Sequence, residues 1–279
     1  MAQSEDGNPA VAFVRERPFA VVFVVLAVVL GADIVRKLAT GGVLISDIAT
    51  FLWDGTILGL SIGLAGVGLA MTYSILNFAN FAHGDYITAG AFAGWITTFV
   101  VAGLGEFSLQ ALVLIGGPIP VSTANLGISV TSTPFAIGLG IVVSAGTTAV
   151  LALGIDRIVF KPMREQRGIS LLIASVGVAL ALRYLIVYVF QASSRGLTAG
   201  GLTPSYAVGF GQGTLTINAH EVALVVLAGS LMLGTHVLLK YTKLGTAMRA
   251  MADNEDLAQV TGIPTERVVR ATWLLGGAL

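Results

Sequence analysis

The sequence contains no cysteine and few charged residues. Of its 279 residues, 11% are charged and the formal net charge is zero, whereas soluble domains carry about 25% charged residues. The absence of cysteine excludes disulfides and thiolate metal sites, and the balanced charge gives no indication of nucleic-acid binding. With 55% hydrophobic residues and a mean hydropathy of +0.88, the chain has too little polar surface for a water-soluble domain. We therefore expect an integral membrane protein whose surface contacts lipid.

The phosphate-binding loop pattern G-x-x-x-x-G-K-[S/T] is also absent from the chain. One apolar stretch carries four closely spaced glycines, but it has neither the lysine nor a preceding strand: Gly59, Gly63, Gly66 and Gly68. We predict helix packing through Gly59 and Gly63, because small residues let membrane helices approach closely. If ATP drives this protein, a separate subunit must hydrolyse it. No nucleophile–base constellation occurs either, so we expect no enzyme activity and no cofactor.

Long apolar runs dominate the rest of the sequence. Runs near 20 residues without ten-residue alternation are typical of membrane helices rather than of a barrel. We expect an all-α, polytopic transmembrane helical bundle with about six complete spans and an incomplete C-terminal span. The expected spans are Pro18–Val35, Thr56–Leu76, Tyr86–Leu104, Phe135–Ile155, Ser170–Phe190 and Glu221–Leu239, with a seventh beginning near Val268.

The first span has two interpretations. It could be a signal peptide, but it lacks a clear A-x-A cleavage site and its leader is long, so an uncleaved anchor is favoured. Residues 1–52 are therefore expected to form an N-terminal tail and an extra anchor helix, and residues 53–279 the main domain. Within the linker of residues 105–133, Phe107–Ile119 is expected to be re-entrant or interfacial.

Lysine and arginine set the expected orientation. Residues 156–168 and 240–270 are rich in both, whereas the linkers 105–133 and 191–217 hold only Arg195 between them. This asymmetry places the two basic segments and the N-terminus in the cytoplasm. Arg36 and Lys37 then fall outside, against the rule.

The segment Gly245–Gly262 is charged and amphipathic and lies between two expected spans. Asp253 is expected to cap a helix of about eight residues, with Asp256 in its first turn. On this helix Leu257 and Val260 share a face. Gly262 and Pro264 end the helix, and Thr265 caps the next one, with Glu266 at its start. Such a helix fits a groove on a partner, although an ordinary interfacial helix is the simpler interpretation from the residues alone.

A second polar segment lies at the end of an expected span, where Gly84 interrupts the helix: Asn77, Asn80, His83 and Asp85. Polar groups beside hydrocarbon must face protein or a water-filled cavity. They could form a capped turn that packs the bundle, a proton relay, or a broken helix whose polar ends line a passage. We expect no metal, because no third ligand stands at a recognisable spacing.

Arg183 lies inside the expected fifth span. Its side chain could snorkel to the membrane surface, pair across the bundle, or face the path of a solute. Asp33 and Arg36, three residues apart, are predicted to form a surface pair at a helix end.

Three stretches together resemble the branched-chain amino acid permeases of ABC importers. Glu255, Ala258 and Gly262, followed by GIPTERV, resemble the loop by which such permeases dock on their ATPase subunits. Asn80–Gly84 match the family signature NFAHG, and Ile155–Gly168 resembles the family's basic loop. The resemblance covers about residues 53–279.

This resemblance implies a permease subunit in a prokaryotic plasma (inner) membrane that imports leucine, isoleucine and valine by alternating access. The implied partners are two ABC ATPase subunits, a second homologous permease subunit and an extracytoplasmic substrate-binding protein. The implied sites are an ATPase-docking loop with Glu255, Leu257, Ala258, Val260 and Gly262, and a substrate passage beside Asn77, Asn80, His83 and Asp85. Relatives that carry urea or short amides are an alternative, and an ATP-independent channel or secondary transporter is a less favoured one.

The C-terminal end sets one further expectation. Only nine residues follow Arg270, and as a helix they reach roughly 14 Å against a hydrocarbon core of about 30 Å. Permeases of the suspected family continue with further helices at this point. We therefore expect the domain to be C-terminally incomplete.

Overall fold

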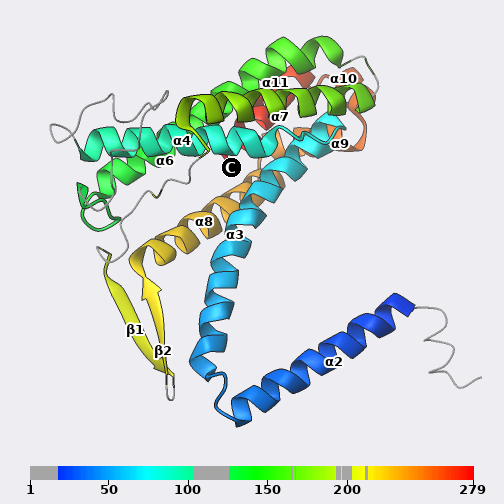
Figure 1. Cartoon of the computed structure of the whole chain (residues 1–279). Coiled ribbons are helices and arrows are strands. Elements are labelled where there is room, and N and C mark those ends of the chain that lie inside the picture. The colour runs from blue at the N-terminus through cyan, green and yellow to red at the C-terminus, as the bar shows by residue number, and fades with distance from the viewer. Residues whose placement is uncertain are drawn as a thin grey trace, which may run out of the picture. The chain divides into compact units, whose positions relative to one another are not determined.

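The computed structural model describes residues 18–103, 126–164, 166, 168–192, 196, 203–210 and 213–279. It has the predicted all-α, polytopic architecture (Figure 1). The helices are α2 Pro18–Ala39, α3 Ile45–Leu76, α4 His83–Ala102, α6 Pro134–Ile155, α7 Gly168–Phe190, α8 Ala219–Tyr241, α9 Lys243–Asp253, α10 Glu255–Val260 and α11 Thr265–Ala278. A π-helical turn, η2 Asp156–Phe160, and a 3₁₀ turn, η3 Lys161–Met163, continue α6. The two-stranded sheet β1 Ser205–Phe210 and β2 Gly213–Asn218 was not predicted.

Among the described residues, six helices are long and apolar enough to cross a membrane, and they correspond to the six predicted spans. The main difference is that α3 begins at Ile45 rather than at Thr56, because its less apolar start, with Asp47 and Asp54, is helical as well. At 32 residues it is about 48 Å long, which exceeds the hydrocarbon core of about 30 Å. The predicted Phe107–Ile119 segment and the N-terminal tail lie outside the described residues.

The chain divides into two compact units, Met1–Asp54 with Ala207–Thr216, and Gly55–Tyr206 with Ile217–Leu279. In the first unit, Arg36 Nη2 donates to Asp33 Oδ1 at 2.9 Å, and Lys37 Nζ lies 2.8 Å from Asp33 Oδ2. The predicted surface pair is therefore present, with Lys37 as an additional partner. Both candidate sites lie in the second unit.

In the second unit α4 and α6 lie side by side (Figure 1). Glycine makes this approach possible, since a Cβ at Gly94 would lie 2.8 Å from the Gly140 carbonyl oxygen, and one at Gly90 would collide with the Thr148 hydroxyl. Thr98 Oγ1 also donates across the pair to the Ala136 carbonyl at 3.3 Å. The small residues of α4 thus serve close helix packing.

The glycines of α3 behave differently from the prediction. A Cβ at Gly59 would meet nothing within 4 Å, so the predicted packing through this residue is wrong. Close approaches occur instead at Gly63, where a Cβ would lie 3.0 Å from Met232 Cε, and at Gly68, where it would lie 2.8 Å from the Gly276 carbonyl oxygen. Glycine spacing alone does not reveal which face of a helix is covered.

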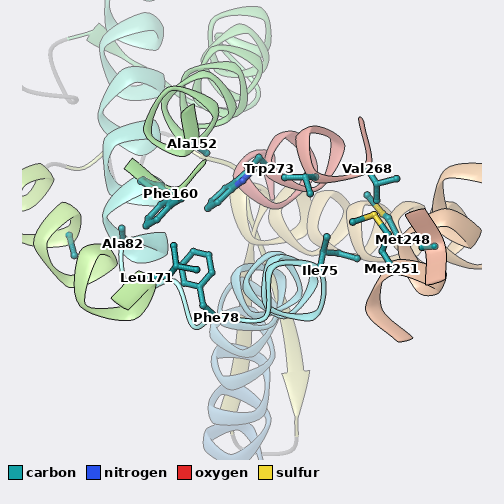
Figure 2. Packing of buried hydrophobic residues seen from close by; sticks show 14 residues of the cluster. Ile75, Phe78, Ala82, Ala152, Phe160, Leu171, Met248, Met251, Val268 and Trp273 are labelled. Carbon is teal, nitrogen blue, oxygen red and sulfur yellow. The ribbon is translucent and has the colours of Figure 1, made fainter. Parts of the chain in front are cut away.

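One cluster of buried side chains joins the helix ends of the second unit (Figure 2). We call it the central cluster: Ile75, Phe78, Ala82, Tyr86, Ala152, Phe160, Leu171, Ala179, Met248, Met251, Ala258, Val268, Val269 and Trp273. The Phe160 ring lies between two others, with centroid distances of 5.1 Å to Phe78 and 5.5 Å to Trp273. Since Phe78 belongs to the polar segment and Met248, Met251 and Ala258 to the amphipathic one, a single core supports both candidate sites.

Candidate functional site

The amphipathic segment, residues 243–262, consists of two helices, α9 and α10, and we call it the docking segment. The Thr242 hydroxyl caps α9 by accepting from the Gly245 N–H at 3.1 Å. Gly245, Met248 and Met251 follow at intervals of three and are buried. A Cβ at Gly245 would collide with the backbone of Leu239, so the tight turn from α8 into α9 requires glycine.

Local hydrogen bonds fix both ends of α10. Asn254 is the N-cap, and its Oδ1 accepts from the Leu257 N–H at 2.8 Å. The predicted cap at Asp253 is therefore wrong, because Asp253 is still the last residue of α9. At the other end Gly262 has a φ of +87°, and its N–H and that of Ile263 donate to the carbonyls of Gln259 and Ala258, both at 3.0 Å. This Schellman motif confirms Gly262 as the stop signal.

The expected length of α10 and the cap of α11 also need correction. With both ends closed as described, α10 has six residues rather than about eight. Thr265 does not cap α11, because it is already the first helical residue and Pro264 precedes it.

The two faces of α10 have different environments. Ala258 is 3% exposed and belongs to the central cluster, whereas Leu257 and Val260 are 60% and 79% exposed. Glu255 and Asp256 occupy the first turn and are exposed as well, where carboxylates favour the positive end of the helix dipole. The segment is therefore held from inside and presents an apolar pair with neighbouring carboxylates on its outside.

Four charged side chains beside the docking segment form a network that sequence analysis missed. We call Asp156, Lys161, Arg164 and Glu266 the charge network. Arg164 Nη2 donates to both carboxylate oxygens of Asp156, at 2.9 and 2.7 Å, and Nη1 donates to Glu266 Oε1 at 3.0 Å. Lys161 Nζ donates to Glu266 Oε2 at 3.1 Å. The network ties the connection between α6 and α7 to the start of α11.

Electrostatics in this network favour the ionised form of Glu266. The hydrogen bond from Lys161, together with the positive charges of Arg164, Lys161 and Arg270, holds the pKa of Glu266 below its usual value, despite partial burial. The basic residues of this connection were predicted only to set the orientation. The π-helical turn, which buries Asp156, left no signal in the sequence.

The polar segment contains a break between α3 and α4, residues 77–82. Asn77 ends α3 in the left-handed region, with a φ of 54° and its N–H donating to the Tyr73 carbonyl at 2.9 Å. The break lies against α7, where the Ser175 hydroxyl accepts from the Phe81 N–H at 3.1 Å and donates to the Leu172 carbonyl of its own helix at 2.7 Å. Ser175 lies about 10 Å along α7 from its first residue by helical rise. Non-helical backbone therefore extends well into the length of a neighbouring span.

The break and the start of α4 place three of the four predicted polar residues in buried positions. Asn80, His83 and Asp85 are buried, while Asn77 is exposed at the end of α3. Asn80 Oδ1 accepts from the Ala82 N–H at 3.1 Å, and His83 Nε2 donates to the Ala65 carbonyl at 3.0 Å. The predicted interruption at Gly84 is wrong, because α4 begins at His83 and the break precedes it.

The histidine has no set of metal-ligand neighbours. Across the described ranges, no three His, Cys, Asp or Glu side chains come close enough together to hold a metal ion. His83 instead connects the start of α4 to α3 through its hydrogen bond to the Ala65 carbonyl.

Asp85 pairs with Arg183 across the bundle, 98 residues away in sequence, at 3.2 Å from Oδ1 to Nε. Of the three roles considered for Arg183, the structure supports pairing across the bundle. The Asp85 side chain is 7% exposed, and that of Arg183 is 64% exposed. A cavity of about 410 Å³ adjoins the pair, and its walls include Thr88, Phe92, Ile186 and Val187.

A second cavity of about 620 Å³ lies among α3, α4, α6, α8 and α11. Its walls are mostly apolar, with side chains such as Leu64, Trp95, Ile141 and Leu227, and include no charged side chain. It offers space for an apolar group but no means of recognising charge.

The fold and these sites define a multi-pass α-helical membrane protein with a broken helix and an anchored amphipathic surface segment. Residues 51–279 match the family described as "Branched-chain amino acid transport system / permease component". The chain belongs to this family.

Three relatives illustrate the similarity. The high-affinity branched-chain amino acid transport system permease protein LivH of Escherichia coli K12 is 23% identical over 230 residues, which cover 82% of this chain and 66% of the relative. BraD of Pseudomonas aeruginosa, of the same description, is 22% identical with the same coverage. A probable LivH of Methanocaldococcus jannaschii is 27% identical, covering 77% of this chain and 58% of its own length. The chain thus spans about two thirds, or less, of these relatives, and no solved structure matches it.

Proposed function

We propose that this chain acts as the transmembrane permease subunit of an ABC importer for branched-chain amino acids. The observation that carries the proposal is the family match over residues 51–279, which includes both the docking segment and the break. In this proposal residues 1–52 are an additional anchor, and the N-terminus and the docking segment face the cytoplasm of a prokaryotic cell. The partners are two ATPase subunits, a second homologous permease subunit and an extracytoplasmic substrate-binding protein.

The docking segment supports the ATPase contact. Leu257 and Val260 form an exposed apolar pair on a helix whose opposite side, at Ala258, is fixed in the central cluster. A helix presented in this way fits a hydrophobic groove on a partner, and Glu255 and Asp256 would steer it toward a basic rim. Gly262 keeps the segment in place by ending α10.

The break supports a role for the polar segment in the solute passage. Irregular backbone at membrane depth is tolerated where it is buried in protein or lines a cavity, and discontinuous helices form the binding sites of many transporters. Asn80 and Tyr86 place buried polar side-chain groups beside the break, and polar residues within spans mark functional sites. Asn80, His83 and Asp85 are the residues we assign to the passage, with Asn77 at its edge.

Energy coupling in this proposal comes from the partners. The chain has no phosphate-binding loop, so its own role is alternating access rather than hydrolysis. Movement of an ATPase subunit would reach the break through the packed rings of Trp273, Phe160 and Phe78.

Cysteine crosslinking tests the proposed docking directly, because the chain has no cysteine of its own. Gln259→Cys, on the exposed side of α10, should crosslink to an ATPase subunit in the assembled complex. Tyr206→Cys, 65% exposed in β1, is the matched control and should not. Absence of a crosslink at every position from Asp253 to Gly262, in a complex shown to be assembled, would overturn the docking assignment.

A further inference from the structure

Arg183 has unused hydrogen-bonding capacity inside a membrane span. Its Nε donates to Asp85, and its two terminal nitrogens have no partner within the part of the chain that the structure describes. Charged side chains within spans are costly and indicate a functional site by default. A guanidinium whose terminal nitrogens are free is suited to bind a carboxylate through two parallel hydrogen bonds.

Only one of the two carboxylate oxygens of Asp85 accepts a hydrogen bond from the described residues. Its Oδ1 accepts from Arg183, while Oδ2 makes no hydrogen bond to the described residues. A ligand could therefore bind both charged groups without breaking the bond between them. Because Asp85 is nearly buried, an ammonium group beside Oδ2 would be shielded from water, which strengthens the attraction.

Beside the charged pair, the adjoining cavity is lined by the polar side chains of Thr88 and Gln191 and by an apolar part suited to an aliphatic group. Ile186 and Val187 come from the same helix as Arg183, and Phe92 comes from the same helix as Asp85. The Phe92 ring is stacked on Phe190 at a centroid distance of 4.3 Å, which fixes its orientation. Opposite charges thus lie together with rigid apolar side chains around one space of about 410 Å³, within the size range of small-molecule sites.

We propose that this cavity binds the zwitterionic head group of an aliphatic amino acid. The α-carboxylate bonds to the terminal nitrogens of Arg183, the α-ammonium group bonds to Asp85 Oδ2, and the side chain lies against Phe92, Ile186 and Val187. The inference rests on the proposed function and adds the residues that recognise the solute during passage.

Charge balance explains why a zwitterion is preferred. A free carboxylate would be repelled by Asp85, a free amine would be repelled by Arg183, and a neutral amide would satisfy neither group fully. The same argument disfavours urea and short amides as solutes of this permease.

Binding of leucine to the assembled complex in lipid nanodiscs, without the binding protein, tests the inference. Saturation-transfer difference NMR detects weak ligands and separates the permease from the selectivity of the binding protein. We expect a leucine signal, and we expect leucinamide, 4-methylpentanoate and isobutyramide to compete at least tenfold more weakly. Equal competition by any of the three analogues would overturn the proposal.

Variants locate the binding site. Arg183→Gln should weaken leucine binding at least tenfold, and Asp85→Asn/Arg183→Gln should do the same without leaving an unpaired buried carboxylate. Arg36→Gln, in α2, removes an arginine that pairs with Asp33 of the same helix and should leave binding unchanged. If Arg183→Gln prevents assembly of the complex, leucine binding is measured on the double variant instead. Leucine binding of wild-type strength in an assembled variant would overturn the assignment.

Failure of the inference and failure of the proposed function give different results. A wild-type complex that imports leucine but shows no leucine signal, or keeps the signal in the variants, contradicts only the cavity. A wild-type complex with its ATPases and binding protein that imports no branched-chain amino acid contradicts the proposed function itself.

Discussion

Gly262 adopts a backbone conformation that other residues rarely reach, with a φ of +87°. A Cβ at this position would meet no neighbour within 4 Å, so the requirement for glycine is conformational rather than steric. Placing an L-residue in the left-handed region costs about 1–2 kcal/mol. We therefore expect Gly262→Ala to loosen the end of α10 and to weaken co-purification of the chain with the proposed ATPase subunits.

Gly146→Ala is the matched control for this prediction. A Cβ at Gly146 would also meet no neighbour within 4 Å, but this residue lies in the interior of α6 with an ordinary φ. Alanine there should be neutral or stabilise by roughly 0.5–1 kcal/mol. Thermal stability and ATPase co-purification, measured on both variants, distinguish the effects, and equal behaviour would remove the conformational argument.

Single-residue signals were predictable where the cause is local. The stop at Gly262 follows from a glycine preference that operates within one turn. The cap at Asn254 was missed by one residue, because the choice between Asp253 and Asn254 depends on where α9 ends, and α9, whose Met248 and Met251 pack in the central cluster, continues to Asp253. Local patterns fix the type of signal, and tertiary packing fixes its position.

At the scale of elements, the charge network joins α11 to the turn after α6 through two carboxylates in different environments. The Asp156 side chain is 7% exposed and accepts two hydrogen bonds from Arg164, whereas that of Glu266 is 45% exposed. Breaking a buried pair costs about 3 kcal/mol, while an exposed pair contributes about 0.2–1 kcal/mol. Asp156→Asn should therefore lower the unfolding midpoint of the complex much more than Glu266→Gln, and the reverse order would contradict this account.

The contribution of Glu266 also depends on pH. Since the folded state holds the pKa of Glu266 below its usual value, its stabilisation is fully present above the unfolded value of about 4.3 and is lost as pH falls through the lowered pKa. The difference in midpoint between wild type and Glu266→Gln should be constant from about pH 7 to pH 5 and should shrink below about pH 4. A difference that persists unchanged in strong acid would argue against the ion pair as its cause.

The spans themselves were predictable, because their apolar runs exceed what any loop tolerates. The pairs that cross between them were not. Asp85 and Arg183 are 98 residues apart, and Arg164 and Glu266 are 102 apart, and no spacing rule connects such positions. The sheet of β1 and β2 was missed because two strands of six residues each give a weak signal beside long hydrophobic helices.

At the scale of the whole molecule, the distribution of lysine and arginine predicts which segments face the cytoplasm. Single cysteines at two exposed positions, Gln166→Cys between α6 and α7 and Tyr206→Cys in β1, test this in intact cells. A membrane-impermeant thiol reagent should label Tyr206→Cys from outside and should reach Gln166→Cys only after permeabilisation. The opposite pattern would invert the proposed orientation and place the docking segment on the wrong side for an ATPase.

The docking segment is folded in the chain alone, without a partner subunit. Asn254 and Gly262 close the two ends of α10 with backbone hydrogen bonds, and Met248, Met251 and Ala258 hold the inner side. A subunit that meets this surface has no chain to order, so little conformational entropy is lost on association. Complex assembly would then proceed as a rigid-body encounter, with a rate limited by orientation and slowed by salt as Glu255 and Asp256 are screened.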